Sequence, residues 1–205
     1  MPSGCWTSTS PRSTGACRSS PSARSGTRPG WQPPWPARRA TPAPLYRLKV
    51  KSGYLRRRLS DRQIDALHHH LTRSDYDHPA GSVSLHTHGG KVNAVAPDAT
   101  ATPHRDAIIK MFYVNGWEDP RDDARHIGWL PELYEDLYAD TGGAPAAADG
   151  AFINYPDTDL ADPALNTGAP WHALYFGDNY RRLQRVKAKW DPRNVFHHAL
   201  SVRAA

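Results

Sequence analysis

The chain has only two cysteines among its 205 residues, Cys5 and Cys17, and both lie near its start. Eleven residues separate them, a spacing that fits no common zinc motif, and two thiols cannot build a disulfide framework. No apolar run approaches the roughly 20 residues that a membrane-spanning helix needs, and no apolar core of a secretory signal is present. These absences exclude a disulfide-rich scaffold and favour a cytoplasmic protein that crosses no membrane.

Residues 1–44 contain no lysine and no acidic residue, yet they hold six arginines, eight serines and nine of the nineteen prolines. The six arginines account for the whole formal charge of +6, because the rest of the chain is electrically balanced. Without apolar periodicity this segment cannot offset the entropy of ordering, so we expect a disordered tail. Because the positive charge lies on this expected tail, it does not indicate a folded surface that binds nucleic acid. The prolines of the tail oppose the amphipathic helix of a transit peptide.

The first third of the remaining chain predicts one helix and two short strands. Ser60 and Gln63 have the spacing of a capping box, and Ile64, Leu67 and Leu71 would form the apolar stripe of the helix that follows. Residues 82–87 and 91–95 are typical of two strands on either side of a Gly-Gly turn. This part therefore predicts a helix packed near a hairpin.

The middle of the chain predicts a buried strand and then a helix. Residues 107–114 are apolar enough for a strand that is buried on both faces, and residues 127–138 repeat apolar side chains at helical spacing. Pro131 indicates a kink or a second helix start. An Ala/Gly/Pro-rich loop follows at 142–150. Strands and packed helices without strict alternation predict an α+β fold with an antiparallel or mixed sheet.

The end of the chain indicates a loop, a helix and a stop. Asp178 and Asn179 are both able to cap a helix, and Leu183, Val186 and Trp190 then recur at helical spacing. Proline follows directly after Asp191, where it lacks the N–H that a continuing helix needs. A basic helix face with five Arg and Lys residues favours a solvated surface, with phosphate or nucleic acid contact as the alternative.

This C-terminal string, YFGDNYRRLQRVKAKWDPRNVF, resembles the end of the berberine-bridge-enzyme-like (BBE) FAD-linked oxidases. Further similar motifs lie upstream, in residues 49–55, in Gly89-Gly90, in TATPHR at 100–105 and in AFINYPDTDL at 151–160. The resemblance covers about residues 46–203. Thr102 stands where the family has an aromatic residue, and Leu200 stands where it usually has Gln.

The resemblance implies the C-terminal part of such an oxidase, without the N-terminal half that binds FAD. Residues 45–148 would form part of the substrate-binding domain, and residues 149–205 the berberine-like C-terminal segment. The family oxidises alcohols, sugars or secondary metabolites by passing hydride to flavin, with oxygen as the acceptor. We expect a fragment of a truncated or mis-started reading frame, inactive alone, whose partner is the missing FAD-binding domain. The alternative is a non-enzymatic module that docks on a separate flavin-domain chain.

Tyr155 is the main candidate for chemistry. On composition alone, Phe152 to Tyr155 favours an edge strand whose tyrosine fills space. In a subset of the family, a tyrosine at this position is proposed to remove a substrate proton. Because a phenol of ordinary pKa near 10 is a poor base at neutral pH, this role requires neighbours or the cofactor to lower the pKa. The resemblance also implies flavin contacts for Asn154, Tyr155 and Asn179. For Asn179 a helix cap is the simpler prediction, and Asp157 and Asp159 are typical of residues that fix a turn.

The eleven histidines suggest a metal site, which their spacing opposes. His68, His69 and His70 are consecutive on a predicted helix, so their side chains point about 100° apart. His86 and His88 would share one face of a strand, but two ligands are too few unless His104 or Asp106 joins them. The sequence therefore predicts no metal site.

Overall fold

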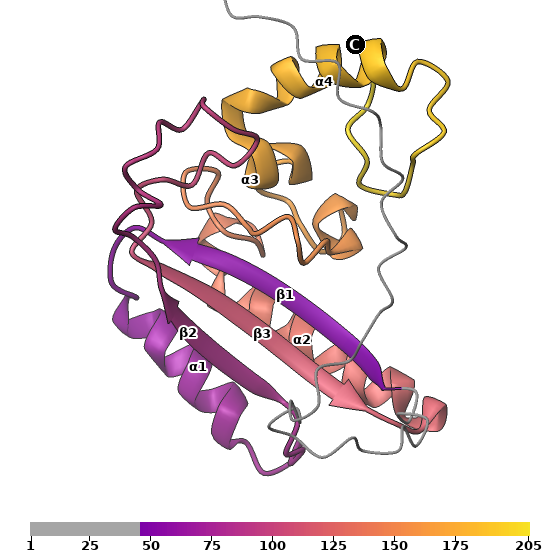
Figure 1. Cartoon of the computed structure of the whole chain (residues 1–205). Coiled ribbons are helices and arrows are strands. Elements are labelled where there is room, and N and C mark those ends of the chain that lie inside the picture. The colour runs from indigo at the N-terminus through magenta and orange to yellow at the C-terminus, as the bar shows by residue number, and fades with distance from the viewer. Residues whose placement is uncertain (1–45) are drawn as a thin grey trace, which may run out of the picture. The chain divides into compact units, whose positions relative to one another are not determined.

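The computed structural model describes residues 46–205, which lie within one compact unit. The tail predicted for residues 1–44, together with Cys5 and Cys17, lies outside the described residues. Within residues 46–205 the backbone forms one antiparallel sheet with helices on one of its faces, and two further helices lie on the β1 side (Figure 1). The predicted α+β class with an antiparallel sheet is confirmed.

The sheet has the strand order β1-β3-β2. Its strands are β1 (Arg47–Leu55), β2 (Ser82–Thr87) and β3 (Ile109–Trp117). In the register, Lys51 lies opposite Tyr113 on β3, and Leu85 lies opposite Met111. The apolar strand of the sequence is therefore the central one, and its two neighbours both run antiparallel to it.

The two faces of β3 differ, which corrects the prediction of a strand buried on both sides. Met111 and Tyr113 are fully buried on the face that α2 covers. Phe112 and Val114 point to the opposite face and are only partly buried. That second face is only partly covered, since Tyr54 of β1 is buried on it while Phe112 and Val114 are not, and we call it the open face of the sheet.

Helix α1 (Asp61–Thr72) begins at the predicted capping box, in which Ser60 and Gln63 bond each other's backbone N–H. Its buried face is only partly the predicted one. Ala66 and His70 are buried and Leu67 packs against the core, whereas Ile64 and Leu71 are about half exposed. The helix is turned this way because its neighbour is α2, whose Trp129 indole N–H donates to the His70 carbonyl and whose Asp136 bonds His70 Nε2.

Helix α2 (Asp123–Leu137) supplies most of the core. Leu130, Leu133 and Leu137 are completely buried against the sheet, and each such side chain contributes roughly 2 kcal/mol through burial. Pro131 lies inside this helix, and the helix does not restart there. The predicted second helix start is therefore wrong, because the packed leucines on either side keep one continuous helix.

Residues 91–95 form successive turns rather than the predicted strand. Gly90 has a positive φ of 61°, and the Val92 N–H donates to the Gly89 carbonyl at 3.3 Å. The amide of Asn93 then donates to the carbonyl of Ala107 at 2.9 Å, which holds the loop against the start of β3. This segment is therefore held by turns and a side-chain bond, and it does not pair with β2.

The C-terminal region consists of loops and two helices, α3 (Trp171–Phe176) and α4 (Tyr180–Trp190). Helix α4 ends as predicted, since Asp191 accepts bonds from the N–H groups of Val195 and Phe196. Short 3-10 turns occur at Pro120–Asp122, Ala139–Thr141, Thr158–Ala161 and Gly177–Asn179. No helix within residues 46–205 has the length and apolar character to cross a membrane.

Candidate functional site

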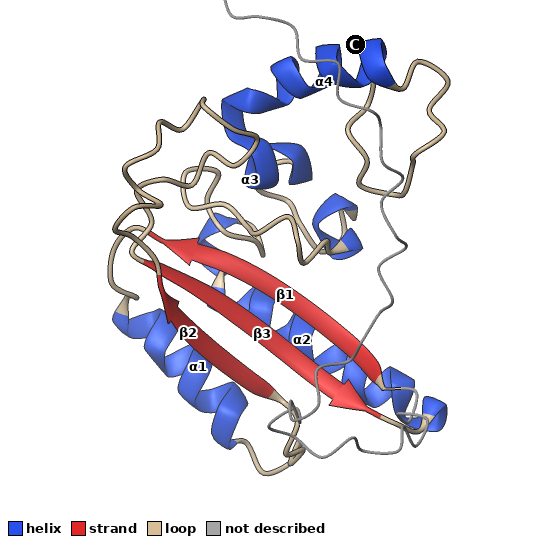
Figure 2. Cartoon of the chain, in the orientation of Figure 1, coloured by secondary structure: helices blue, strands red, loops and turns tan. Residues whose placement is uncertain are grey.

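The segment that carries Tyr155 is part of the orange chain beside β1 in Figure 1, a region of loops and short helical turns in Figure 2. The N–H of Tyr54 donates to the Gly150 carbonyl at 3.1 Å, and the N–H of Phe152 donates to Ser52 Oγ at 2.9 Å. Residues 152–155 then form a turn, in which the Tyr155 N–H donates to the Phe152 carbonyl at 3.0 Å. The predicted edge strand is therefore wrong: backbone bonds to β1 stop at the turn.

Tyr155 lies on the open face of the sheet. Its ring is 4.6 Å from the ring of Phe112 on β3 and 5.2 Å from the ring of Phe152. The ammonium group of Lys110 lies over the Phe152 ring at 4.4 Å. Tyr155 is half-buried among these rings, and the neighbouring Asn154 is exposed.

Four charged side chains lie just beyond Tyr155, on the opposite side of β1. Lys51 Nζ lies 2.6 Å from Asp157 and 2.7 Å from Asp159, and Lys49 Nζ lies 2.7 Å from Asp159. Burial disfavours the charge on Lys49, but attraction to Asp157 and Asp159 outweighs it, so the pKa of Lys49 is raised. We call these four residues the Lys–Asp network.

Asp157 also performs its predicted role in the turn. Its carboxylate accepts the N–H of Asp159 at 3.3 Å and begins the 3-10 turn Thr158–Ala161. The network itself is a feature that sequence reasoning missed. The signal was present, because lysines at alternate positions of an otherwise buried strand require partners.

Asn179 does not cap α4, which corrects the prediction of a helix cap. The residue is the first position before the helix but makes no side-chain capping bond. Its amide instead donates to the carbonyls of Pro97 at 2.8 Å and Thr100 at 3.1 Å. Both amide hydrogens therefore hold the 97–100 loop, and a flavin contact of Asn179 stays a prediction.

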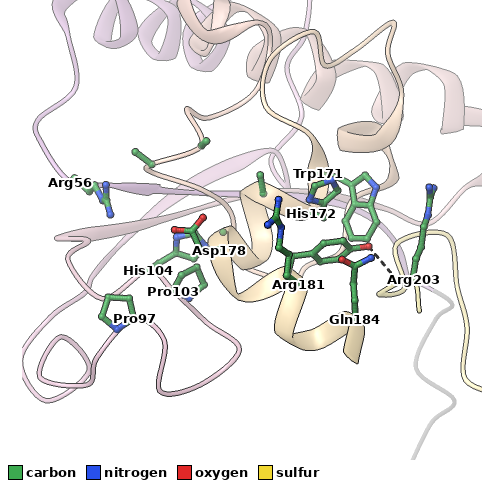
Figure 3. A pocket seen from close by; sticks show the side chains of 15 residues that line it. Arg56, Pro97, Pro103, His104, Trp171, His172, Asp178, Arg181, Gln184 and Arg203 are labelled. Atoms are coloured by element: carbon green, nitrogen blue, oxygen red, sulfur yellow. Dashed lines mark hydrogen bonds between the residues drawn. The ribbon is translucent and has the colours of Figure 1, made fainter. Parts of the chain in front are cut away.

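A cleft of about 1160 Å³ lies between α3, α4 and the loops that precede β3 and α3 (Figure 3). Its lining includes Arg56, His104, His172, Arg181 and Arg203. The Arg56 side chain is already paired with Asp106 at 2.7 Å, and the backbone N–H of Arg203 donates to the Tyr180 hydroxyl at 3.2 Å. Tyr155 and Asn154 are not among the residues that line this cleft.

The histidines do not converge on a metal. His88 bonds the backbone carbonyl of His104 through Nε2 at 3.2 Å. Among residues 46–205 no group of three or more His, Cys, Asp or Glu side chains is placed to hold a metal ion. On the basic helix face, Arg182 donates to the Asp98 carbonyl and Lys187 pairs with Asp191, so two of its five cations bond within the fold.

His104 is expected to make the fold sensitive to acid. The ring is 4% exposed and stacks on Tyr54, and burial lowers its pKa from 6.5 to about 4. Between these values the unfolded chain takes up a proton that the folded chain refuses. Stability is therefore fully present above pH 6.5 and should fall by up to about 3 kcal/mol as the pH drops to 4.

Denaturant unfolding at pH 7 and at pH 4.5 measures this loss. The lowered pKa values of His70 and His126, both chiefly due to burial, act in the same direction. His104→Gln should therefore reduce the pH dependence without abolishing it. An identical loss in the wild type and in His104→Gln would contradict the assignment.

Comparison with known proteins identifies the family that this chain resembles. Residues 151–203 match the family described as "Berberine and berberine like". The chain is 49% identical to the aclacinomycin-N/aclacinomycin-A oxidase of Streptomyces galilaeus, over 77% of this chain and 29% of that protein.

Solved structures agree. The flavoenzyme CrmK of caerulomycin biosynthesis has a TM-score of 0.75 at 49% identity, over 78% of this chain and 33% of that one. The glycopeptide hexose oxidase DBV29, solved with teicoplanin, has a TM-score of 0.71 at 53% identity, over 76% of this chain and 32% of that one. The chain thus spans about a third of the length of these relatives. By sequence and by fold, it belongs to the berberine-bridge-enzyme-like FAD-linked oxidases and corresponds to their C-terminal part.

Proposed function

We propose that this chain supplies the substrate-facing sheet and the proton acceptor of an FAD-linked oxidase. The observation that carries the proposal is the position of Tyr155, which lies on the open face of the sheet beside Phe112 and Lys110. Residues 45–148 would be part of the substrate-binding domain, and residues 149–205 would return to the flavin domain. The cofactor-binding half of the enzyme would be a separate part, so this chain alone would be inactive.

The residues on the open face suit a flat aromatic cofactor. Phe112 and Phe152 provide apolar rings, and the exposed amide of Asn154 offers both donors and an acceptor for the polar edge of a flavin. Asn154, Tyr155 and Asn179 are the proposed contacts, and the Asn179 amide also holds the 97–100 loop. The chemistry that FAD supplies in such enzymes is acceptance of a hydride, followed by transfer of two electrons to oxygen to give hydrogen peroxide.

The role of this chain is to hold the substrate and to take its proton. As a carbon–hydrogen bond of the substrate gives up hydride, the adjacent hydroxyl becomes a carbonyl and must lose its proton. Tyr155 Oη in its phenolate form is the proposed acceptor, and it becomes the neutral phenol as it takes up the proton; the ring contacts the two phenylalanines at the open face. The ring of Tyr155 would then direct its oxygen toward the reacting hydroxyl.

The substrate class follows from the relatives rather than from the site. Two similar oxidases are named for, or were solved with, natural products: aclacinomycin for one and teicoplanin for a hexose oxidase. We therefore propose an alcohol or sugar hydroxyl of a secondary metabolite as the substrate.

The first test is whether the purified chain binds flavin. We expect a colourless protein without absorbance at about 450 nm, because most FAD contacts would belong to the missing half. Fusing the FAD-binding domain of a relative ahead of Leu45 should give a yellow protein. A yellow chain before fusion, or a folded fusion that remains colourless in the presence of FAD, would overturn the proposal.

A further inference from the structure

The loop with Tyr155 is attached to both sides of one strand. Along β1, side chains alternate, so Ser52 faces the open side of the sheet while Lys49 and Lys51 face α2. Phe152 bonds Ser52 on the open side, and five residues later Asp157 bonds Lys51 on the other side. The chain therefore passes over the edge of β1 between these two anchors, and Tyr155 lies in that passage.

The second anchor is buried and closely balanced. The side chains of Lys51 and Asp157 are each 3% exposed, and the network contains two positive and two negative groups. A buried ion pair adds little stability over well-packed apolar residues, but removal of one partner leaves a charge without compensation. Such a pair is suited to fixing one geometry, because only that geometry satisfies both charges.

A third contact holds the same loop through α3. The buried Tyr175 on α3 accepts the N–H of Asp157 at 2.9 Å, and its hydroxyl donates to the carbonyl of Tyr155 at 3.4 Å. One hydroxyl thus joins the residue that carries the proposed chemistry to the residue that enters the Lys–Asp network.

From these contacts we propose that Lys51 and Asp157, together with Tyr175, are positioning residues for Tyr155. The proposal rests on the function proposed for Tyr155. The charged groups of Lys51 and Asp157 bond each other. Lys51 fixes Asp157, Asp157 and Tyr175 fix the backbone of the loop, and the loop sets where the Tyr155 ring meets Phe112. Lys49 and Asp159 complete the charge balance.

The test uses the 205-residue chain and two readouts. Hydrogen exchange should rise at least about tenfold for the amides of residues 151–158 in Lys51→Met, while the amides of α2 keep their protection. The second readout is the NMR signal of the Tyr155 ring in a chain labelled with 13C-tyrosine, assigned by its absence in Tyr155→Phe. This signal should move in Lys51→Met, because the ring leaves the neighbouring phenylalanines. Lys51→Arg keeps the charge and should restore both readouts in large part.

A matched control is Arg47→Gln, which removes a more exposed ion pair with Asp123 from the same strand. It should leave residues 151–158 and the Tyr155 signal unchanged. Should Lys51→Met fail to fold, Tyr175→Phe removes only a hydroxyl and should loosen the same amides. The proposal is overturned if exchange at 151–158 stays as in the wild type, or rises only together with that of α2, or if the Tyr155 signal does not move.

These outcomes are independent of catalysis. A loop that loosens in Lys51→Met shows that the network positions Tyr155 whether or not Tyr155 accepts a proton. A Tyr155→Phe enzyme of normal rate would instead refute the proposed function and leave the positioning result standing.

Discussion

Tyr155→Phe is expected to slow flavin reduction by about 10² to 10⁴-fold, the range typical of a lost general base. The measurement is stopped-flow reduction of a complete enzyme, made by fusing a related FAD-binding domain ahead of Leu45. Phenylalanine keeps the ring contact with Phe112 and removes only the hydroxyl. Substrate affinity should therefore change little, because the lost interaction belongs to the proton transfer.

Tyr46→Phe is the matched control for this experiment. Tyr46 is 54% exposed and lies outside the loop of residues 150–160, so loss of its hydroxyl should leave reduction unchanged. If Tyr155→Phe reduced the flavin as fast as the wild type, Tyr155 would be a packing residue of the open face. A large rise in the substrate dissociation constant at an unchanged limiting rate would assign the hydroxyl to binding instead.

The isolated fragment of residues 45–205 is expected to associate rather than remain a monomer. Strand β2 pairs only with β3 within the described residues, so its outer N–H and C=O groups are available to another strand. Large apolar side chains are also exposed, with Leu85 at 55%, Trp190 at 75% and Phe196 at 80%. Size-exclusion chromatography with light scattering should show dimers or larger species.

Leu85→Lys tests the part that β2 plays in this association. The substitution places a charge on the free edge strand and should shift the fragment toward monomer. Ile127→Lys is the control, because Ile127 is similarly exposed at 42% but lies on α2 away from that edge. A wild-type monomer with a cooperative melt would contradict the expectation and favour the module that docks on a separate flavin-domain chain.

Local signals in the sequence were sufficient for the elements whose geometry is set locally. The capping box at Ser60 begins α1, and the proline after Asp191 follows the end of α4. The apolar run at 107–114 contains most of the central strand. In each case the deciding interaction lies within a few residues of the chain, so the pattern alone carries it.

The wrong predictions concern choices that distant parts of the chain decide. The predicted stripe of α1 included Ile64 and Leu71 beside Leu67, but only Leu67 packs against the core, and the position of α2 buries Ala66 and His70. Asn179 has the residue type and place of a helix cap, yet carbonyls about eighty residues earlier take its amide. The Lys–Asp network joins residues about a hundred positions apart, and only the fold shows that they meet.

The closure of the β1 edge by residues 150–160 has a consequence for synthesis of the protein. Ser52 and Phe152 are separated by 100 positions in the sequence, and the carboxylate of Asp157 that pairs with Lys51 is separated from it by 106 positions. Contacts of such long sequence separation form late, because the intervening chain must first be ordered. On the ribosome, β1 would leave the exit tunnel with an open edge and two uncompensated lysines. The three strands could pair earlier, but the β1 edge would be covered only after residues 150–160 have been made.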